Sequence, residues 1–91
     1  MHAVIYTKDN CPYCVRAKNL MSSRNISYDE KIIALNGPDS RHLTEHQSWT
    51  TREALLEAAP AARTVPQIWL DGVHIGGHDD LVKYLQDHHN K

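Results

Sequence analysis

The sequence has few cysteines, no phenylalanine and no excess of positive charge. Among 91 residues there are two cysteines and no Phe, and ten basic residues against eleven acidic ones give a formal net charge of −1. Without a basic surface field, the chain lacks the main electrostatic means of holding nucleic acid, so nucleic acid is not an expected partner. A hydrophobic content of 41% is too high for a disordered chain.

Targeting and membrane-spanning segments are also missing. Met1-His2-Ala3 leads directly into a strand pattern without the apolar region of a signal peptide, and no apolar run reaches the length of a membrane span. No repeat or linker divides the chain. We therefore expect a single domain over residues 1–91, located in the cytoplasm and not bound to a membrane.

Several catalytic motifs are absent as well. The sequence has no Gly-x-Ser-x-Gly nucleophile motif, no phosphate-binding loop and no clustered set of metal ligands. The two cysteines are therefore the groups best suited to carry chemistry.

The cysteines stand three positions apart in Cys11-Pro12-Tyr13-Cys14, after the apolar residues 4–7 and before apolar residues at helical spacing. This pattern predicts a strand-to-helix junction with Pro12 at the helix start. A helix N-terminus favours a thiolate at Cys11, and Cys14 returns to the same face one turn later, so a reversible disulfide is expected. In a reducing compartment the pair favours a catalytic dithiol. Half of a zinc site, completed by histidines, is the alternative.

The middle of the chain predicts a strand followed by helix. Residues 26–33 have strand-like composition, and the preceding helix makes a crossover, so this strand should run parallel to the first. After a break rich in turn residues, Asp39 or Ser40 is the expected cap of a helix. Thr51 is expected to begin a second helical piece. We thus predict a lengthened second-helix region over about residues 36–60.

His42 and His46 lie four residues apart in this region and would share one face of a helix. That spacing can hold a metal ion. Because the sequence fixes no cysteine or carboxylate beside them, we expect two solvent-exposed histidines and no metal site.

The last third predicts a hairpin and a helix. Residues 64–70 form the next candidate strand, Asp71-Gly72 is a two-residue hairpin turn, and residues 73–75 should return antiparallel. A final helix should begin at His78. The predicted order is β-α-β-α-β-β-α, an α/β protein with a mixed four-stranded sheet and helices on both faces.

Three stretches then carry a recognisable pattern: Tyr6-Thr7-Lys8-Asp9-Asn10-Cys11-Pro12-Tyr13-Cys14, Thr64-Val65-Pro66-Gln67-Ile68 and Asp71-Gly72-Val73-His74-Ile75-Gly76-Gly77-His78-Asp79-Asp80-Leu81. Together they strongly resemble a dithiol glutaredoxin of the CPYC type. The resemblance covers the first 35 residues and those from about 61 to the end. It implies the thioredoxin fold, with glutathione as the reducing co-substrate and no metal.

The resemblance also implies roles for individual residues. Cys11 would be the attacking thiol and Cys14 the resolving one. A cis peptide bond before Pro66 would turn the backbone of Val65 toward glutathione, which would pair with it as a short added strand. The seven residues implied to bind glutathione are Lys8, Tyr13, Thr64, Val65, Pro66, Asp79 and Asp80.

The sequence departs from the family pattern in its middle and at two later positions. The span from Cys14 to Pro66 is about three helical turns longer than is usual, a feature that partly resembles phage-type glutaredoxins. Residues 61–63 replace a glycine that many members have, and His78 stands where tyrosine or cysteine is common.

The implied activity is glutathione-dependent reduction of protein disulfides and glutathione mixed disulfides, with ribonucleotide reductase as one guess at a protein substrate. A monomer is expected. Two other functions stay open at this point. One is a thioredoxin-like redoxin served by a flavoprotein reductase. The other is an iron–sulfur carrier in which Cys11 and glutathione from two subunits hold one cluster.

Overall fold

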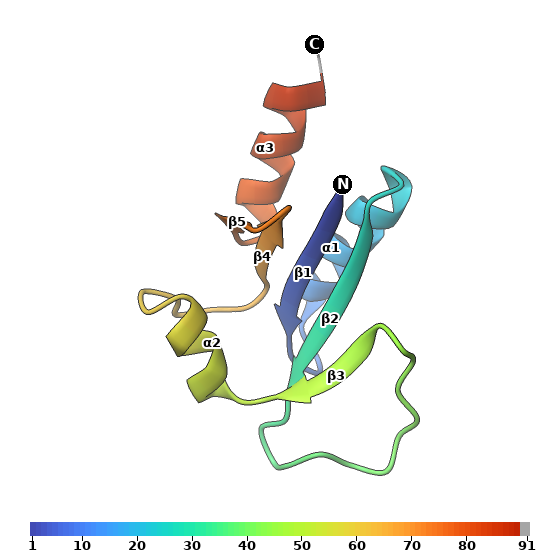
Figure 1. The fold of residues 1–91 in the computed structure, drawn as a ribbon, viewed down its shortest axis with the longest axis vertical. Helices are drawn as coiled ribbons and strands as arrows, with labels where there is room; N and C mark the ends of the chain where they lie inside the picture. Colours follow the sequence, from blue (N-terminus) through green and yellow to red (C-terminus); the bar gives the residue numbers. More distant parts are fainter. Residues whose placement is uncertain (90–91) are drawn as a thin grey trace.

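A mixed five-stranded sheet lies at the centre of the structure, a computed structural model that describes residues 1–89 (Figure 1). The strand order across the sheet is β3-β2-β1-β4-β5. Along the chain the elements are β1 (His2–Thr7), α1 (Pro12–Ser23), β2 (Ser27–Ile33), β3 (Gln47–Thr50), α2 (Arg52–Ala58), β4 (Gln67–Leu70), β5 (Val73–Gly76) and α3 (His78–His89).

The pairing of β1 on both sides fixes the centre of the sheet. Ile5 in β1 lies opposite Glu30 of the parallel strand β2 and opposite Ile68 of the antiparallel strand β4. β5 then pairs antiparallel with β4. Asp71 and Gly72 both have positive φ, 48° and 84°, which is the backbone of a type I′ hairpin turn. The predicted parallel pair and the predicted hairpin are therefore confirmed.

Helices cover both faces of the sheet, as predicted. On one face α1 and α3 pack on β1 and β4 through a core of nine buried residues: Ala3, Ile5, Ala17, Met21, Ile26, Ile68, Leu70, Leu81 and Leu85. On the other face α2 and the segment after it pack on the sheet through a smaller core: Tyr6, Ile33, Leu55 and Ala59. Alternate residues of β1, such as Ile5 and Tyr6, enter opposite cores because side chains alternate along a strand.

The predicted number of four strands is wrong, because residues 47–50 form β3 at the edge of the sheet instead of helix. β3 pairs parallel with β2, with Trp49 opposite Ile32. Its sequence, Gln-Ser-Trp-Thr, contains residues that favour strands. Residues 39–46 contain a single large apolar residue, Leu43, so no apolar face exists that could hold a helix against the sheet.

The predicted helix cap at Asp39 or Ser40 is likewise wrong. Residues 38–46 are without helix, and the Asp39 carboxylate accepts hydrogen bonds from Arg41 instead. The second piece does begin where predicted: Thr51 is the N-cap of α2, and its Oγ1 accepts the N–H of Ala54 at 3.1 Å. Only α2, seven residues long, is helical within the 36–60 region.

His42 and His46 do not share a helical face, because both lie outside helices. His46 Nδ1 is 3.1 Å from a carboxylate oxygen of Asp29, which also contacts His2. Among the side chains that the structure describes, no group of three or more His, Cys, Asp or Glu residues could hold a metal ion. None of the helices that the structure describes has the length and apolar character needed to cross a membrane.

Candidate active site

Cys11 and Cys14 form a disulfide at the start of α1, with their Cα atoms 5.2 Å apart. Cys11 is the N-cap residue, with extended backbone, and Pro12 opens the helix. The Cys14 N–H, which has no acceptor within the helix, points at the Cys11 sulfur at 3.2 Å. Cys11 is 9% exposed and Cys14 is 2% exposed. The backbone donor of the helix start therefore faces the more accessible sulfur.

A groove of about 390 Å³ lies between α1, the segment before β4 and the start of α3. It gathers six of the seven residues that were predicted to bind glutathione: Tyr13, Thr64, Val65, Pro66, Asp79 and Asp80. Gly77 and His78 complete its lining. These residues come from three parts of the chain, and tertiary structure alone brings them together.

The segment before β4 places backbone groups next to the disulfide. The Val65–Pro66 peptide bond is cis, as the resemblance implied. The carbonyl oxygen of Val65 lies 3.7 Å from the Cys11 sulfur. An extended ligand attached to Cys11 would therefore run beside the backbone of Val65.

Lys8 is the one predicted residue that does not line this groove. It borders a small hollow of about 170 Å³ with Thr64 and Val65, and a larger hollow that also contains the two cysteines. Lys8 is exposed and has no ion-pair partner among the described residues. It therefore offers a cation without a partner in a separate hollow that shares Thr64 and Val65 with the groove.

Asp79 and Asp80 differ in what they contact. The Asp80 carboxylate accepts the N–H of Gly77 at 3.0 Å and so caps α3 in the manner of a capping box. Asp79 is 94% exposed in its side chain, and its only described contact is with the His78 ring at 3.1 Å. Gly76, with φ of 120°, has no room for a Cβ beside the Asp80 carboxylate. Asp80 thus stabilises the local backbone, while Asp79 is free to meet a ligand.

Tyr13 forms part of the groove wall, and its ring contacts two neighbouring side chains. The His78 ring lies 5.8 Å away between centroids, and the Arg16 guanidinium lies 5.1 Å from the Tyr13 centroid. Tyr13 remains 52% exposed. These neighbours hold the ring at the edge of the groove while leaving much of it available for contact.

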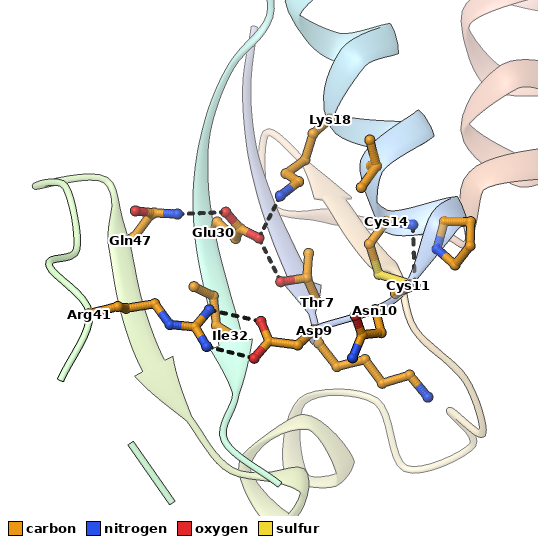
Figure 2. A pocket seen from close by; sticks show the side chains of 13 residues that line it. Thr7, Asp9, Asn10, Cys11, Cys14, Lys18, Glu30, Ile32, Arg41 and Gln47 are labelled. Atoms are coloured by element: carbon orange, nitrogen blue, oxygen red, sulfur yellow. Dashed lines mark hydrogen bonds and ion pairs between the residues drawn. A yellow bond between two sulfur atoms is a disulfide. The ribbon is translucent and has the colours of Figure 1, made fainter. Parts of the chain in front are cut away.

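On the side of the disulfide that faces β3 lies a second, larger hollow of about 610 Å³, shown in Figure 2. Its floor holds Glu30, which is 5% exposed. Three donors satisfy this carboxylate: the Thr7 hydroxyl at 2.7 Å, Lys18 Nζ at 3.0 Å and Gln47 Nε2 at 3.0 Å. Burial raises the pKa of Glu30, but the hydrogen bonds from Thr7, Gln47 and Lys18 outweigh it, so the pKa lies below its ordinary value.

Arg41 stabilises the outer wall of this hollow through ion pairs. Its guanidinium donates to both carboxylate oxygens of Asp9, at 2.8 and 2.7 Å, and also pairs with Asp39. The same guanidinium lies 4.9 Å from the centroid of the Trp49 indole. Because Asp9 is two residues before Cys11, one side chain links the 34–46 loop to the turn that carries the reactive sulfur. The hydrogen bonds from Arg41 lower the pKa of Asp9.

Lys8, Cys11 and Cys14 were predicted as site residues, but six other residues of this second hollow were not: Thr7, Asp9, Lys18, Glu30, Arg41 and Gln47. One usable signal existed, since Lys18 is four residues after Cys14 and so shares its helical face. Glu30 and Gln47 are brought together by the pairing of β2 with the unforeseen strand β3. Arg41 lies in a segment without any periodic pattern.

A sequence model of the glutaredoxin family matches residues 3–75. The chain belongs to the glutaredoxin family. Among curated glutaredoxins, glutaredoxin 3 of Escherichia coli K12 is 42% identical over 77 residues, which are 85% of this chain and 77% of that protein. Glutaredoxin 1 of Rickettsia typhi is 36% identical over 84 residues, 92% of this chain and 70% of the relative.

Solved glutaredoxin structures share the fold. Reduced E. coli glutaredoxin matches with a TM-score of 0.71 at 32% identity, with both chains fully covered. A buckwheat glutaredoxin–glutathione complex matches with a TM-score of 0.66 at 29% identity over 93% of this chain and 68% of that one. The thioredoxin-like fold is thereby confirmed, and this glutaredoxin is a thiol–disulfide oxidoreductase with Cys11 and Cys14 as its redox-active pair. The family match ends before Asp79 and Asp80.

Proposed function

We propose that this glutaredoxin uses glutathione to reduce protein disulfides and glutathione mixed disulfides. One observation carries the proposal: a single groove beside Cys11 contains the Val65 backbone, the exposed Asp79 carboxylate and the start of α3. Glutathione has a peptide backbone, carboxylates and one free amino group. The groove offers a partner for each kind of group, which a site for a simple thiol would not need.

The proposed orientation follows from the charges along the groove. The unpaired N–H groups at the start of α3 attract the γ-glutamyl carboxylate, and Asp79 accepts from its amino group. The cysteine part of glutathione pairs with the Val65 backbone, 3.7 Å from the Cys11 sulfur. The other carboxylate then reaches toward Lys8, which lines a hollow together with Thr64 and Val65.

The proposed reaction begins with the Cys11 thiolate. It attacks the glutathione sulfur of a mixed disulfide, the protein thiolate leaves with the electron pair, and Cys11 becomes joined to glutathione. A second glutathione thiolate attacks that sulfur, giving glutathione disulfide and regenerating the Cys11 thiolate. For a protein disulfide, Cys14 instead attacks the Cys11–substrate bond and forms the internal disulfide seen here. Two glutathione molecules then reduce this disulfide.

We further propose that the chain acts as a monomer in a reducing compartment such as the cytoplasm, on protein substrates that include ribonucleotide reductase as one hypothesis. A lone redox-active cysteine pair suits such a compartment. Trapping with Cys14→Ser, which stalls the mixed disulfide on Cys11, would identify the substrates.

The two cysteine roles are tested by kinetics with excess glutathione. Cys11→Ser should abolish turnover of a low-molecular-weight glutathione mixed disulfide, because only Cys11 attacks it. Cys14→Ser should keep that turnover and lose the reduction of protein disulfides. Equal loss in both variants would contradict the roles. Full activity with a flavoprotein reductase and none with glutathione would contradict the proposed reductant.

A further inference from the structure

Lys18 and Glu30 form a partly buried ion pair that the proposed glutathione mechanism does not use. Lys18 Nζ lies 3.0 Å from Glu30 Oε2, and the two side chains are 26% and 7% exposed. Glu30 is one of three buried polar residues in the part of the chain that the structure describes, and the only one with a charged side chain.

The stability of the fold does not by itself explain why such a pair is present. Removing two charges from water costs several kcal/mol, and the attraction between them often does no more than offset this cost. Here a hydroxyl from Thr7 and an amide from Gln47 are also needed to satisfy the carboxylate. Thr7 and Gln47 hold the Glu30 carboxylate, and this carboxylate in turn fixes the Lys18 ammonium through one hydrogen bond, which indicates that the position of the ammonium has a use.

The held ammonium faces the hollow that also contains Cys14. Lys18 follows Cys14 by four residues in α1, so the two side chains leave the helix on one face, one turn apart. Figure 2 shows Lys18 reaching from α1 toward Glu30 across this hollow. The other charged residues that line it are Lys8, Asp9 and Arg41, and the last two are paired with each other. His78 and Asp79 of α3 lie in the groove on the other side of the disulfide.

We propose that Lys18 is a positioning residue for the resolving step: held by Glu30, its positive charge stabilises the thiolate of the buried Cys14. In the forward step, the Cys14 thiol gives its proton to solvent and its thiolate attacks the Cys11 sulfur of the mixed disulfide, so that the substrate thiolate leaves. In the reverse direction, a glutathione thiolate attacks Cys11 of the internal disulfide, and Cys14 leaves with the electron pair. Lys18 favours the charged form of Cys14 in both directions.

This inference deepens the proposed dithiol mechanism and rests on it, but its main test needs no glutathione. In a Cys11→Ser background Cys14 is the only thiol, and thiolate absorbance followed against pH gives its titration. We expect Lys18→Gln to lower the thiolate fraction near neutral pH about tenfold, whereas Lys18→Arg keeps it near the starting value. Lys31→Gln is the matched control, because Lys31 is the neighbour of Glu30 but contacts the Tyr6 ring on the opposite face of the sheet.

A second readout connects this titration to turnover. A tenfold loss of thiolate is partly offset by the higher nucleophilicity of a more basic thiol, so the protein-disulfide rate in the Lys18→Gln variant with both cysteines should fall about threefold. A titration that moves no more in Lys18→Gln than in Lys31→Gln would overturn the proposal, whatever reductant the enzyme uses.

Should Lys18→Gln not fold, the coupling is measurable with the natural lysine. In the Cys11→Ser chain, the ¹⁵N signal of Lys18 Nζ should shift along the same pH curve as Cys14 thiolate absorbance, because coupling between two sites is reciprocal. A Lys18 signal whose chemical shift does not change as Cys14 ionises would also overturn the proposal.

Discussion

The two sides of the Cys11–Cys14 disulfide are built in different ways. The groove on the α3 side consists of short stretches that act through their own backbone: a helix start, a cis peptide bond and the glycine-rich turn before α3. The hollow on the β3 side consists of long-range side-chain pairs, such as Arg41 with Asp9, 32 residues apart. Motifs read along the sequence describe the first side well and the second side hardly at all.

The charges on the two sides also differ. In the hollow, Glu30 is paired with Lys18 and Asp9 with Arg41, so most charge is already neutralised within the chain. In the groove, the Asp79 carboxylate is 94% exposed, and its only described contact is with the ring of His78. The difference indicates that the groove leaves its carboxylate available to a ligand, while the hollow holds its charged side chains in fixed positions next to the reactive sulfurs.

The largest expected effect tests the structural side of this comparison. Glu30→Ala leaves the Lys18 ammonium and two further donors without their acceptor, so the free energy of unfolding should fall by about 2–3 kcal/mol. Urea unfolding measures this loss. Asp29→Ala is the matched control on the same strand, because the Asp29 side chain is about half exposed and its removal should change the free energy of unfolding much less. Similar losses in both variants would show that the buried network adds no special stability.

The next effect tests the groove. Asp79→Ala should raise the glutathione KM about tenfold, the equivalent of one charge-assisted contact of about 1.5 kcal/mol, with little change in Tm because the side chain is almost fully exposed. Asp80→Ala should lower the Tm as well, since it removes the cap on Gly77, worth about 1 kcal/mol. Steady-state kinetics and thermal melting separate the two. If the Asp79→Ala variant melts like the natural chain and its glutathione KM is unchanged, the γ-glutamyl contact lies elsewhere.

Acidic pH should lower the free energy of unfolding through protonation of Glu30. Its folded-state pKa lies below the unfolded value of about 4.5, so the folded state binds fewer protons. The stabilisation is therefore fully present above pH 4.5 and is lost as the pH falls through the folded pKa. Melting curves between pH 6 and pH 3 should show a flatter dependence of Tm on pH for Glu30→Gln than for the natural chain. Parallel curves would mean that Glu30 is not the group that titrates with unfolding.

The smallest expected effect concerns the Arg41 contact with Asp9. Both side chains are about half exposed, so Arg41→Ala should lower the free energy of unfolding only slightly, and by less in high salt. Unfolding at low salt and in 1 M salt measures it. Arg63→Ala is the control, an exposed arginine without an ion-pair partner among the described residues. A loss that persists in 1 M salt would mean that stacking on Trp49, and not charge, fastens the loop.

Much of the fold could be predicted because the governing interactions are local. Apolar residues at regular spacing, a proline at the first position of α1 and the Asp71-Gly72 turn each restrict the backbone over a few residues. The same holds for the site: a helix start next to two cysteines is a local feature, and the Thr64-Val65-Pro66 stretch carries its own backbone geometry. These motifs could therefore be recognised in the sequence without knowledge of the packing.

The segment from 34 to 50 could not be predicted, because its conformation depends on partners far away in sequence. β3 exists since the edge of β2 offers backbone groups that Gln47–Thr50 can pair with, and nothing in those four residues alone excludes a helix. The sequence by itself determined the redox pair and the backbone that presents it. Only the tertiary structure decided that Glu30, Lys18 and Arg41 meet beside it, because a buried carboxylate needs donors that only the folded sheet brings within reach.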